Sequence, residues 1–231
     1  MTSEQSAAAG REGATRVSVA QFLIAELAML AIVPFIDQVA YGRLIESVLI
    51  TAVLLMAMFA IGGNRTTLMI AAILLAPAAV GQWIDHFWPG VMPILFTNVT
   101  SLVYVAFVLF HLGRFILRAP RVNNEVLCAG VATYVMVGVF WTFAYLAAAR
   151  LSPESFVIDD TASRPLHGYE ALFLSFGTLS NVGYDEIELV SKPAQMLAMA
   201  EAMTSMFYMT MFIARLVALY SDDRSILPKG D

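Results

Sequence analysis

The sequence predicts an all-α membrane protein with six transmembrane helices and one short segment that enters the bilayer and returns to the same side. Three observations predict this class. Hydrophobic residues make up 59% of the 231 positions and charged residues 13%, with a mean hydropathy of +0.75, which excludes an ordinary soluble domain. Six apolar runs are long enough to cross ~30 Å of hydrocarbon at roughly 20 residues each. A seventh run, between the last two, is too short.

The chain divides into four parts. Residues 1–16 are small, polar and charged, and we expect a disordered cytoplasmic tail. Residues 17–122 form a membrane domain of four helices, residues 123–220 a second domain with the last two helices and the short segment, and residues 221–231 a short cytoplasmic tail. The six spans are expected at about Val17–Ile36, Leu44–Ile61, Thr67–Ile84, Val91–Leu117, Val126–Ala149 and Ala194–Tyr220.

Lysines and arginines set the expected orientation. With the N-terminus inside, nine of the 13 face the cytoplasm and four face outward, which obeys the positive-inside rule. Both termini are therefore expected in the cytoplasm. Arg114, Arg118 and Arg121 lie at spacings of four and three, but a voltage sensor needs its arginines inside the membrane field. Because these three lie at the end of the fourth span, we interpret them as topology anchors.

The short segment reads ALFLSFGTLSNVGYDEI from Ala171 to Ile187. Its first part is an apolar and aromatic helix pattern, with the helix expected at about Tyr169–Ser180. Its last part is not helical in character, because Gly183 favours a positive φ and polar residues flank it. Irregular backbone is tolerated at membrane depth only where it is buried in protein or lines a water-filled path. We expect one of these two settings here.

The run SNVGYDE, residues 180–186, resembles the selectivity filter of potassium channels, which reads TVGYG, and the helix before it resembles their pore helix. Val182-Gly183-Tyr184 is retained, whereas Asn181 stands where the family has Thr and Asp185 where it has the second Gly. The last span is similar to the last helix of small bacterial potassium-channel-like proteins in its runs Glu201-Ala202, Phe207-Tyr208 and Ile213–Val217. The resemblance covers about residues 125–220.

This resemblance implies a homotetramer in a bacterial inner membrane, because one segment per chain can wall only a quarter of a pore. It implies passive conduction of monovalent cations, with backbone carbonyls holding the ion. Asn181 and Asp185 are expected to weaken the preference for K⁺, so that Na⁺ also passes. Clustered carboxylates at the outer mouth would suit a divalent cation. No cofactor, enzymatic activity or nucleic-acid partner is implied. The filter residues are Ser180, Asn181, Val182, Gly183, Tyr184 and Asp185; the carbonyl donors are Val182, Gly183 and Tyr184; the outer mouth is Asp185 and Glu186.

Two other functions stay open. The departures at Asn181 and Asp185, and the lack of a glycine hinge in the last span, also fit a non-conducting membrane protein whose degenerate pore is a structural or interaction module. An intramembrane enzyme or proton-coupled transporter would use Glu26, Glu201 or a histidine, but no catalytic constellation accompanies them, and it ranks last. We expect Glu26 to face the bundle interior and to hydrogen-bond a neighbour. The methionines of the last span are interpreted as packing residues rather than Cu(I) ligands.

Overall fold

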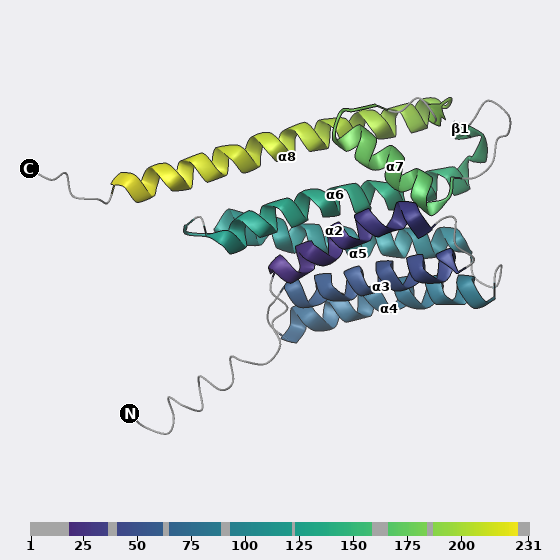
Figure 1. Ribbon diagram of the computed structural model, residues 1–231, viewed down its shortest axis with the longest axis horizontal. Helices are drawn as coiled ribbons and strands as arrows, with labels where there is room; N and C mark the ends of the chain where they lie inside the picture. The colour runs from purple at the N-terminus through teal and green to yellow at the C-terminus, as the bar shows by residue number, and fades with distance from the viewer. Residues whose placement is uncertain are drawn as a thin grey trace, which may run out of the picture.

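The structure is a computed structural model that describes residues 19–36, 41–61, 65–88, 93–121, 123–158, 166–183 and 187–225. Most of this part is helical, in agreement with the predicted class. A 3-10 turn, η1 (Pro153–Ser155), and two strands, β1 (Phe156–Ile158) and β2 (Ile187–Leu189), complete it. The helices are α2 (Val19–Ile36), α3 (Gly42–Ala60), α4 (Arg65–Phe87), α5 (Ile94–Arg118), α6 (Asn124–Leu151), α7 (Gly168–Leu179) and α8 (Lys192–Ser225) (Figure 1).

Five of these helices are long and apolar enough to cross a membrane. They are the whole of α2, α5 and α6, residues Arg65–Ile84 of α4 and residues Lys192–Ala218 of α8. The apolar stretch of α3, Leu44–Ala60, is shorter and lies at the lower limit of ~17 residues for a span. The described chain is therefore a multi-pass membrane protein, and a sixth span at α3 stays a prediction. α8 continues to Ser225, past the expected end of the last span at Tyr220.

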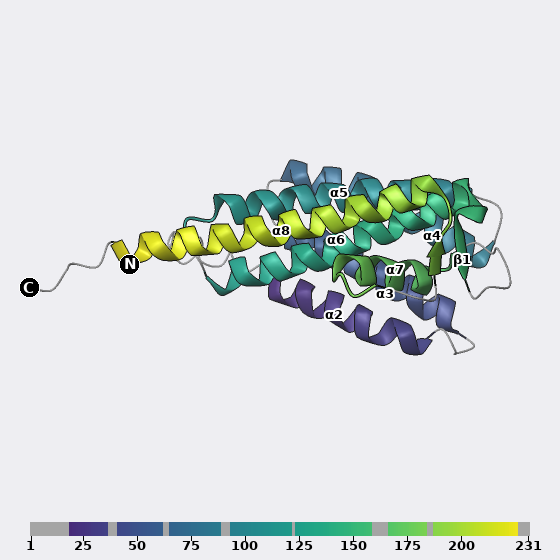
Figure 2. The same ribbon diagram turned by 90° about the horizontal axis from the view of Figure 1, so that it is seen from above.

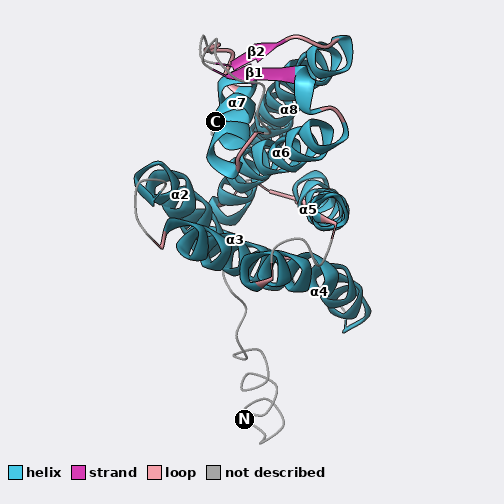
Figure 3. Ribbon diagram, turned by 90° about the vertical axis from the view of Figure 1, so that its right-hand side faces the viewer, coloured by secondary structure: helices cyan, strands magenta, loops and turns pink. Residues whose placement is uncertain are grey.

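The helices lie in three layers. α2, α3 and α4 form a row, α5 and α6 lie on that row, and α7 and α8 lie on α6 (Figures 1 and 3). α6 is the central helix, because it packs against α2 and α5 on one side and against α7 and α8 on the other. One apolar core joins the first two layers, with Phe22, Leu54, Tyr104 and Met136 among its fully buried members. The N-terminal helices and the central helix are thus one packed unit.

Two glycines of α6 let its neighbours approach closely. A Cβ atom added to Gly130 would lie 2.0 Å from Cζ of Phe212 on α8, and one added to Gly138 would lie 2.6 Å from Cζ of Phe176 on α7. Each phenylalanine ring therefore occupies the space that a larger residue on α6 would need. Close helix packing in membranes uses small residues in this way, and here it brings both α7 and α8 against the central helix.

A small antiparallel ribbon, absent from the sequence prediction, closes one end of the bundle. β1 and β2 pair Phe156 with Leu189 and Ile158 with Ile187. Strands of three residues are too short to show the alternation by which strands are recognised, so the sequence does not indicate them. Because the ribbon joins the chain before α7 to the chain after it, the segment containing α7 begins and ends at the same end of the bundle (Figure 3).

Charged residues of the N-terminal helices follow the predictions in part. Glu26 faces the interior and has no exposed surface, but neither of its carboxylate oxygens has a hydrogen-bond partner among the described residues. The expected hydrogen bond is therefore wrong, because Glu26 lies on the face of α2 whose other buried residues are all apolar. Arg114, Arg118 and Arg121 are exposed at the end of α5 and just after it, which fits their interpretation as anchors.

Candidate functional site

The short helix α7 has the dimensions expected of a segment that does not cross the membrane. It has 12 residues, which makes it about 18 Å long at ~1.5 Å per residue, whereas the hydrocarbon layer is ~30 Å thick. It packs against α6 and α8, and Figure 2 shows it beside α8, near the β1 end of the bundle. Its residues Ala171, Leu174 and Ser175 are fully buried, so the protein, and not lipid, surrounds this face of the helix.

Side chains at the start of α7 fix where the helix begins. The carboxylate of Glu170 accepts a hydrogen bond of 2.9 Å from the backbone N–H of His167, which satisfies one of the groups that a helix leaves open at its N-terminus. Glu46 of α3 reaches the same end, since a Cβ atom added to Gly168 would lie 2.1 Å from its Oε1. The carboxylate of Glu46 therefore occupies the space beside Gly168, and α3 contacts this end of α7 directly.

The end of α7 is a Schellman turn. The N–H of Asn181 donates to the carbonyl of Thr178, and the N–H of Val182 donates to the carbonyl of Gly177, both at 3.1 Å. This pattern needs a left-handed residue after the helix, and Asn181 supplies it with φ of 56°. Gly183 also has a positive φ, 83°, as the sequence predicted. The positive φ at Asn181 was not predicted, although Asn is one of the few residues that tolerate it.

Two hydroxyl groups hold the last carbonyl of α7. Ser205 of α8 donates to the carbonyl of Leu179 at 2.6 Å, and Tyr134 of α6 donates to the same oxygen at 3.0 Å. The two hydroxyl oxygens lie 3.3 Å apart. A helix leaves its last carbonyls without partners inside the helix, and these donors satisfy one of them. The carboxyl end of α7 is therefore fixed by both long helices that flank it.

A buried carboxyl group ties the middle of α7 to the same two helices. Glu201 of α8 has no exposed surface. Tyr145 of α6 donates to its Oε2 at 2.6 Å, and the hydroxyl of Ser175 on α7 lies 2.5 Å from its Oε1. Ser175 Oγ is also 2.8 Å from the carbonyl oxygen of Gly138. Glu201 therefore links α6, α7 and α8, whereas the sequence suggested a member of the channel-like last helix or an acid for transport or catalysis and did not indicate this link.

The structure describes part of the predicted site. Ser180, Asn181, Val182 and Gly183 follow one another at the carboxyl end of α7 and are all exposed. Tyr184, Asp185 and Glu186 lie outside the described residues, so the third carbonyl donor and the outer mouth stay predictions. Among the described residues no group of three or more His, Cys, Asp or Glu side chains is placed to hold a metal ion.

Sequence reasoning missed the hydroxyl groups that support α7. Tyr134, Tyr145 and Ser175 belong to apolar helices, and each finds its partner on another helix, 26 to 71 residues away in the chain. The signal that could have found them is Glu201 itself, because a carboxyl group inside a span is almost always paired. Hydroxyl groups on the neighbouring helices are the natural partners, but the sequence does not show which of them face it.

One family of known proteins matches the part of the chain that contains α7. Residues 125–222 match a family model described as an ion channel. The matched stretch covers less than half of the chain, and it runs through α6, α7 and most of α8. No curated protein and no solved structure matches the chain. The match supports an ion channel in a multi-pass membrane protein, and it contains all the supports of α7 described above except Glu46.

Proposed function

We propose that this protein is a potassium-channel-like channel that conducts monovalent cations passively through a tetrameric pore. The observation that carries the proposal is the carboxyl end of α7. There a short helix is held at the carbonyl of Leu179 by both flanking helices and is followed at once by the exposed run Asn181-Val182-Gly183. The negative end of a helix dipole favours a cation, and an exposed backbone run supplies carbonyl groups to bind it.

The exposed surfaces of one chain support the four-fold assembly. In the most apolar stretch of α6, 67% of the residues are buried within the chain, whereas in that of α8 only 11% are buried. Val182 is 82% exposed although it is apolar. In the assembly that we propose, α8 lines the pore and contacts neighbouring chains, and Val182 packs against a neighbour. The exposed methionines of α8 are then packing residues between chains. They are Met196, Met199, Met203, Met206, Met209 and Met211.

The proposed ion path follows from the predicted filter. The backbone carbonyls of Val182, Gly183 and Tyr184 would replace the water around a K⁺ ion, and Asp185 and Glu186 would form an acidic outer mouth. We propose that Asn181 and Asp185 weaken the discrimination between K⁺ and Na⁺, and that a ring of four Asp185 carboxylates binds Ca²⁺ or Mg²⁺. The channel would lie in a bacterial inner membrane with six spans and with both termini in the cytoplasm.

Recording from purified protein in planar bilayers tests this function. We expect discrete current steps carried by K⁺ and by Na⁺, and reduced current when Ca²⁺ is added outside. Asp185→Gly should weaken the block by Ca²⁺ and move the reversal potential toward that of K⁺, and Asp185→Asn should weaken only the block. Native mass measurement should give a tetramer.

Silence from an intact tetramer would overturn the proposal in favour of a non-conducting structural or interaction protein. If only a monomer or a dimer were found, a tetrameric pore would be excluded. If Asp185→Gly changed neither the block nor the reversal potential, Asp185 would not lie at the ion path.

A further inference from the structure

Three arginines gather at the carboxyl end of α5 without a carboxylate partner. Arg114, Arg118 and Arg121 are exposed, and among the described residues none of them forms an ion pair with Asp or Glu. The carboxylate that follows them in the chain, Glu125 in the first turn of α6, is exposed as well. This end of α5 therefore presents more positive than negative charge to its surroundings.

The arginines continue an exposed apolar stripe of α5. Val99, Val103, Phe110 and Leu117 are all exposed, and their spacings of four, seven and seven residues put them on one face of the helix. Arg114 lies on the same stripe, between Phe110 and Leu117. Exposed apolar side chains on a spanning helix suit hydrocarbon, so this stripe fits an acyl chain whose charged head group lies beside Arg114.

Arg114 and Arg118 are spaced to hold one phosphate between them. Residues four apart on a helix have Cβ atoms about 5–6 Å apart, and each guanidinium can donate two parallel hydrogen bonds to a phosphate. The carboxyl end of a helix by itself disfavours an anion. Here Arg215 of α8 donates to the carbonyls of Leu117 and Ala119, each at 3.0 Å. Its positive charge offsets the negative end of α5, so an anion at this end meets arginines rather than bare carbonyl groups.

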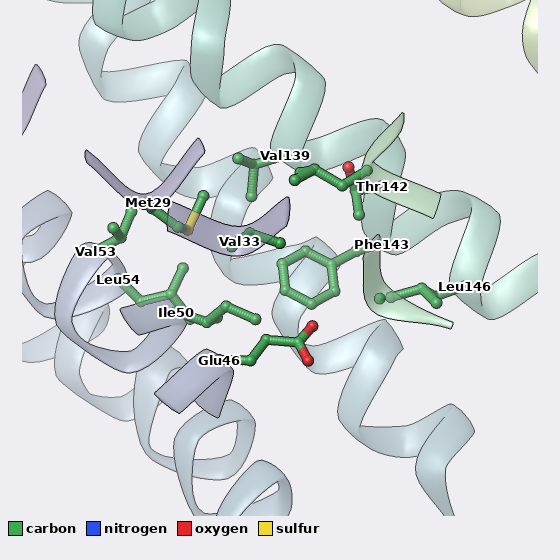
Figure 4. Close-up of a pocket in the computed structure, with 12 residues that line it drawn as sticks. Met29, Val33, Glu46, Ile50, Val53, Leu54, Val139, Thr142, Phe143 and Leu146 are labelled. Carbon is green, nitrogen blue, oxygen red and sulfur yellow. The ribbon is translucent and has the colours of Figure 1, made fainter. Parts of the chain in front are cut away.

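The pocket inside the bundle is too small for an acyl chain. It lies between α2, α3, α6 and α7 and has a volume of about 50 Å³ (Figure 4). Since one water alone needs roughly 10–15 Å³ of such volume, the pocket has room for a few waters and not for the tail of a lipid. A lipid tail is therefore to be placed on the outer surface of the bundle, along the exposed stripe of α5.

We propose that the carboxyl end of α5 binds an anionic phospholipid, with its phosphate on Arg114 and Arg118 and one acyl chain along Val103 and Phe110. Charge complementarity selects the head group, because the ammonium group of a zwitterionic lipid would be repelled by the arginines. This end of α5 is expected in the cytoplasm, where anionic lipid attracts arginines close to a span. The lipid contacts side chains and leaves the hydrogen bonds of Arg215 in place. The site lies outside the part that matches an ion channel, so it does not rest on the proposed function.

Native mass spectrometry of the full chain tests the affinity. Protein in a non-ionic detergent is titrated with dioleoyl phosphatidylglycerol, and dioleoyl phosphatidylcholine, which has the same tails, is the comparison lipid. We expect the first phosphatidylglycerol per chain to bind at least about tenfold more tightly than phosphatidylcholine, since hydrogen bonds to charged groups are worth that much or more. Inorganic phosphate at millimolar concentration should not displace the lipid, because the buried part of the acyl chain contributes to its binding.

Variants separate a shared phosphate site from diffuse attraction. Arg118→Gln should weaken binding of the first phosphatidylglycerol about tenfold, and Arg118→Lys, which keeps the charge but not the two parallel hydrogen bonds, should weaken it less. Once Arg118 is Gln, Arg114→Gln should weaken binding by less than about threefold, because two residues that hold one group are coupled. Arg150→Gln, at an exposed arginine in the last turn of α6, is the matched control and should change nothing. Circular dichroism confirms that each variant is folded.

Photolabelling locates the acyl chain. The probe is phosphatidylglycerol with a diazirine in the middle of one acyl chain, applied to the full chain in phosphatidylcholine nanodiscs, and peptide mass spectrometry locates the adducts. We expect residues 99–110 of α5 to be labelled well above Ile73 of α4, which is 68% exposed. Arg118→Gln should remove this preference, and phosphatidylcholine with the same diazirine should label both helices alike.

Three results would overturn the proposal. Phosphatidylcholine that bound as tightly as phosphatidylglycerol would show that the arginines do not select an anion. Displacement of the lipid by inorganic phosphate would make this a site for free phosphate. Equal losses of affinity from Arg118→Gln and Arg150→Gln, or even labelling of α4 and α5 by phosphatidylglycerol, would show diffuse attraction without a site. None of these measurements depends on conduction, so failure here leaves the proposed channel untouched, and a silent channel leaves this site untouched.

Discussion

Removing the hydroxyl of Tyr145 tests whether Glu201 holds the three helices of the channel-like part together. Tyr145→Phe keeps the ring, which is fully buried against Phe156, and deletes the donor that lies 2.6 Å from Glu201 Oε2. Because Glu201 has no exposed surface, water cannot replace the lost donor. Among the described residues, the partner that the carboxyl group then keeps is Ser175.

The expected cost follows from this geometry. A hydrogen bond to a charged group is worth about 1.5–3 kcal/mol in soluble proteins, whereas hydrogen bonds between membrane helices average about 0.6 kcal/mol and reach about 1.7. Both partners here are fully buried and the distance is short, so we place Tyr145→Phe near the upper membrane value, at about 1.5 kcal/mol. Glu201→Ala should cost more, at about 3 kcal/mol, because it removes both contacts and leaves a cavity.

A double-mutant cycle isolates the bond. The free energy of unfolding is measured in mixed micelles by titration with sodium dodecyl sulfate and followed by circular dichroism. Once Glu201 is Ala, Tyr145→Phe should cost almost nothing further, so the coupling free energy should be about 1–1.5 kcal/mol. Tyr41→Phe is the matched control, because Tyr41 is 73% exposed, and it should stay within ~0.5 kcal/mol of the unaltered protein. A coupling free energy of zero would refute the three-helix link.

Three further predictions concern the packing around α6 and α8. Gly138→Ala should destabilise the protein by about 1–3 kcal/mol because its Cβ would meet Phe176. Gly113→Ala, with nothing within 4 Å of the added atom, should be neutral or stabilising in the same unfolding titration. Ser205→Ala should cost about 1 kcal/mol, and exchange of the Val182 amide, measured by hydrogen–deuterium exchange, should quicken as α7 loses a donor at Leu179. Arg215→Gln should speed amide exchange in residues 119–127, whereas Arg114→Gln, at an exposed position, should leave it unchanged.

The helices could be predicted from the sequence because the length and apolarity of each run are local properties. All six long runs and the short seventh are helices, and their ends lie within a few residues of the predicted ones, except at the carboxyl end of α8. The positive φ of Gly183 was predictable for the same reason, since it depends on one residue. The left-handed Asn181 could have been predicted as well, because a helix that ends before Asn commonly uses it in a Schellman turn.

The supports of α7 could not be predicted, because they depend on which faces of α6 and α8 meet. Tyr145 and Glu201 are 56 residues apart, and a shift of either helix by one residue would rotate its side chain by ~100°. Glu26 is a second case in which the sequence could not predict the contacts between helices. Its burial was predicted correctly, but the hydrogen-bond partner expected for it is absent among the described residues. Burial follows from the local pattern, whereas pairing follows from the arrangement of the helices.

The N-terminal helices are packed firmly against residues 125–222, the part that matches an ion channel. This packing argues against a sensor domain that moves independently of that part. α5 ends at Arg118 and α6 begins at Asn124, so no separate linker helix lies between them. The two helices share one apolar core with α2, α3 and α4. Arg215 of α8 donates to the carbonyls of Leu117 and Ala119, each at 3.0 Å, which places a cation at the carboxyl end of α5, where it is favoured. Outward movement of this part of α8 must therefore either break these two hydrogen bonds or carry α5 and its core with it.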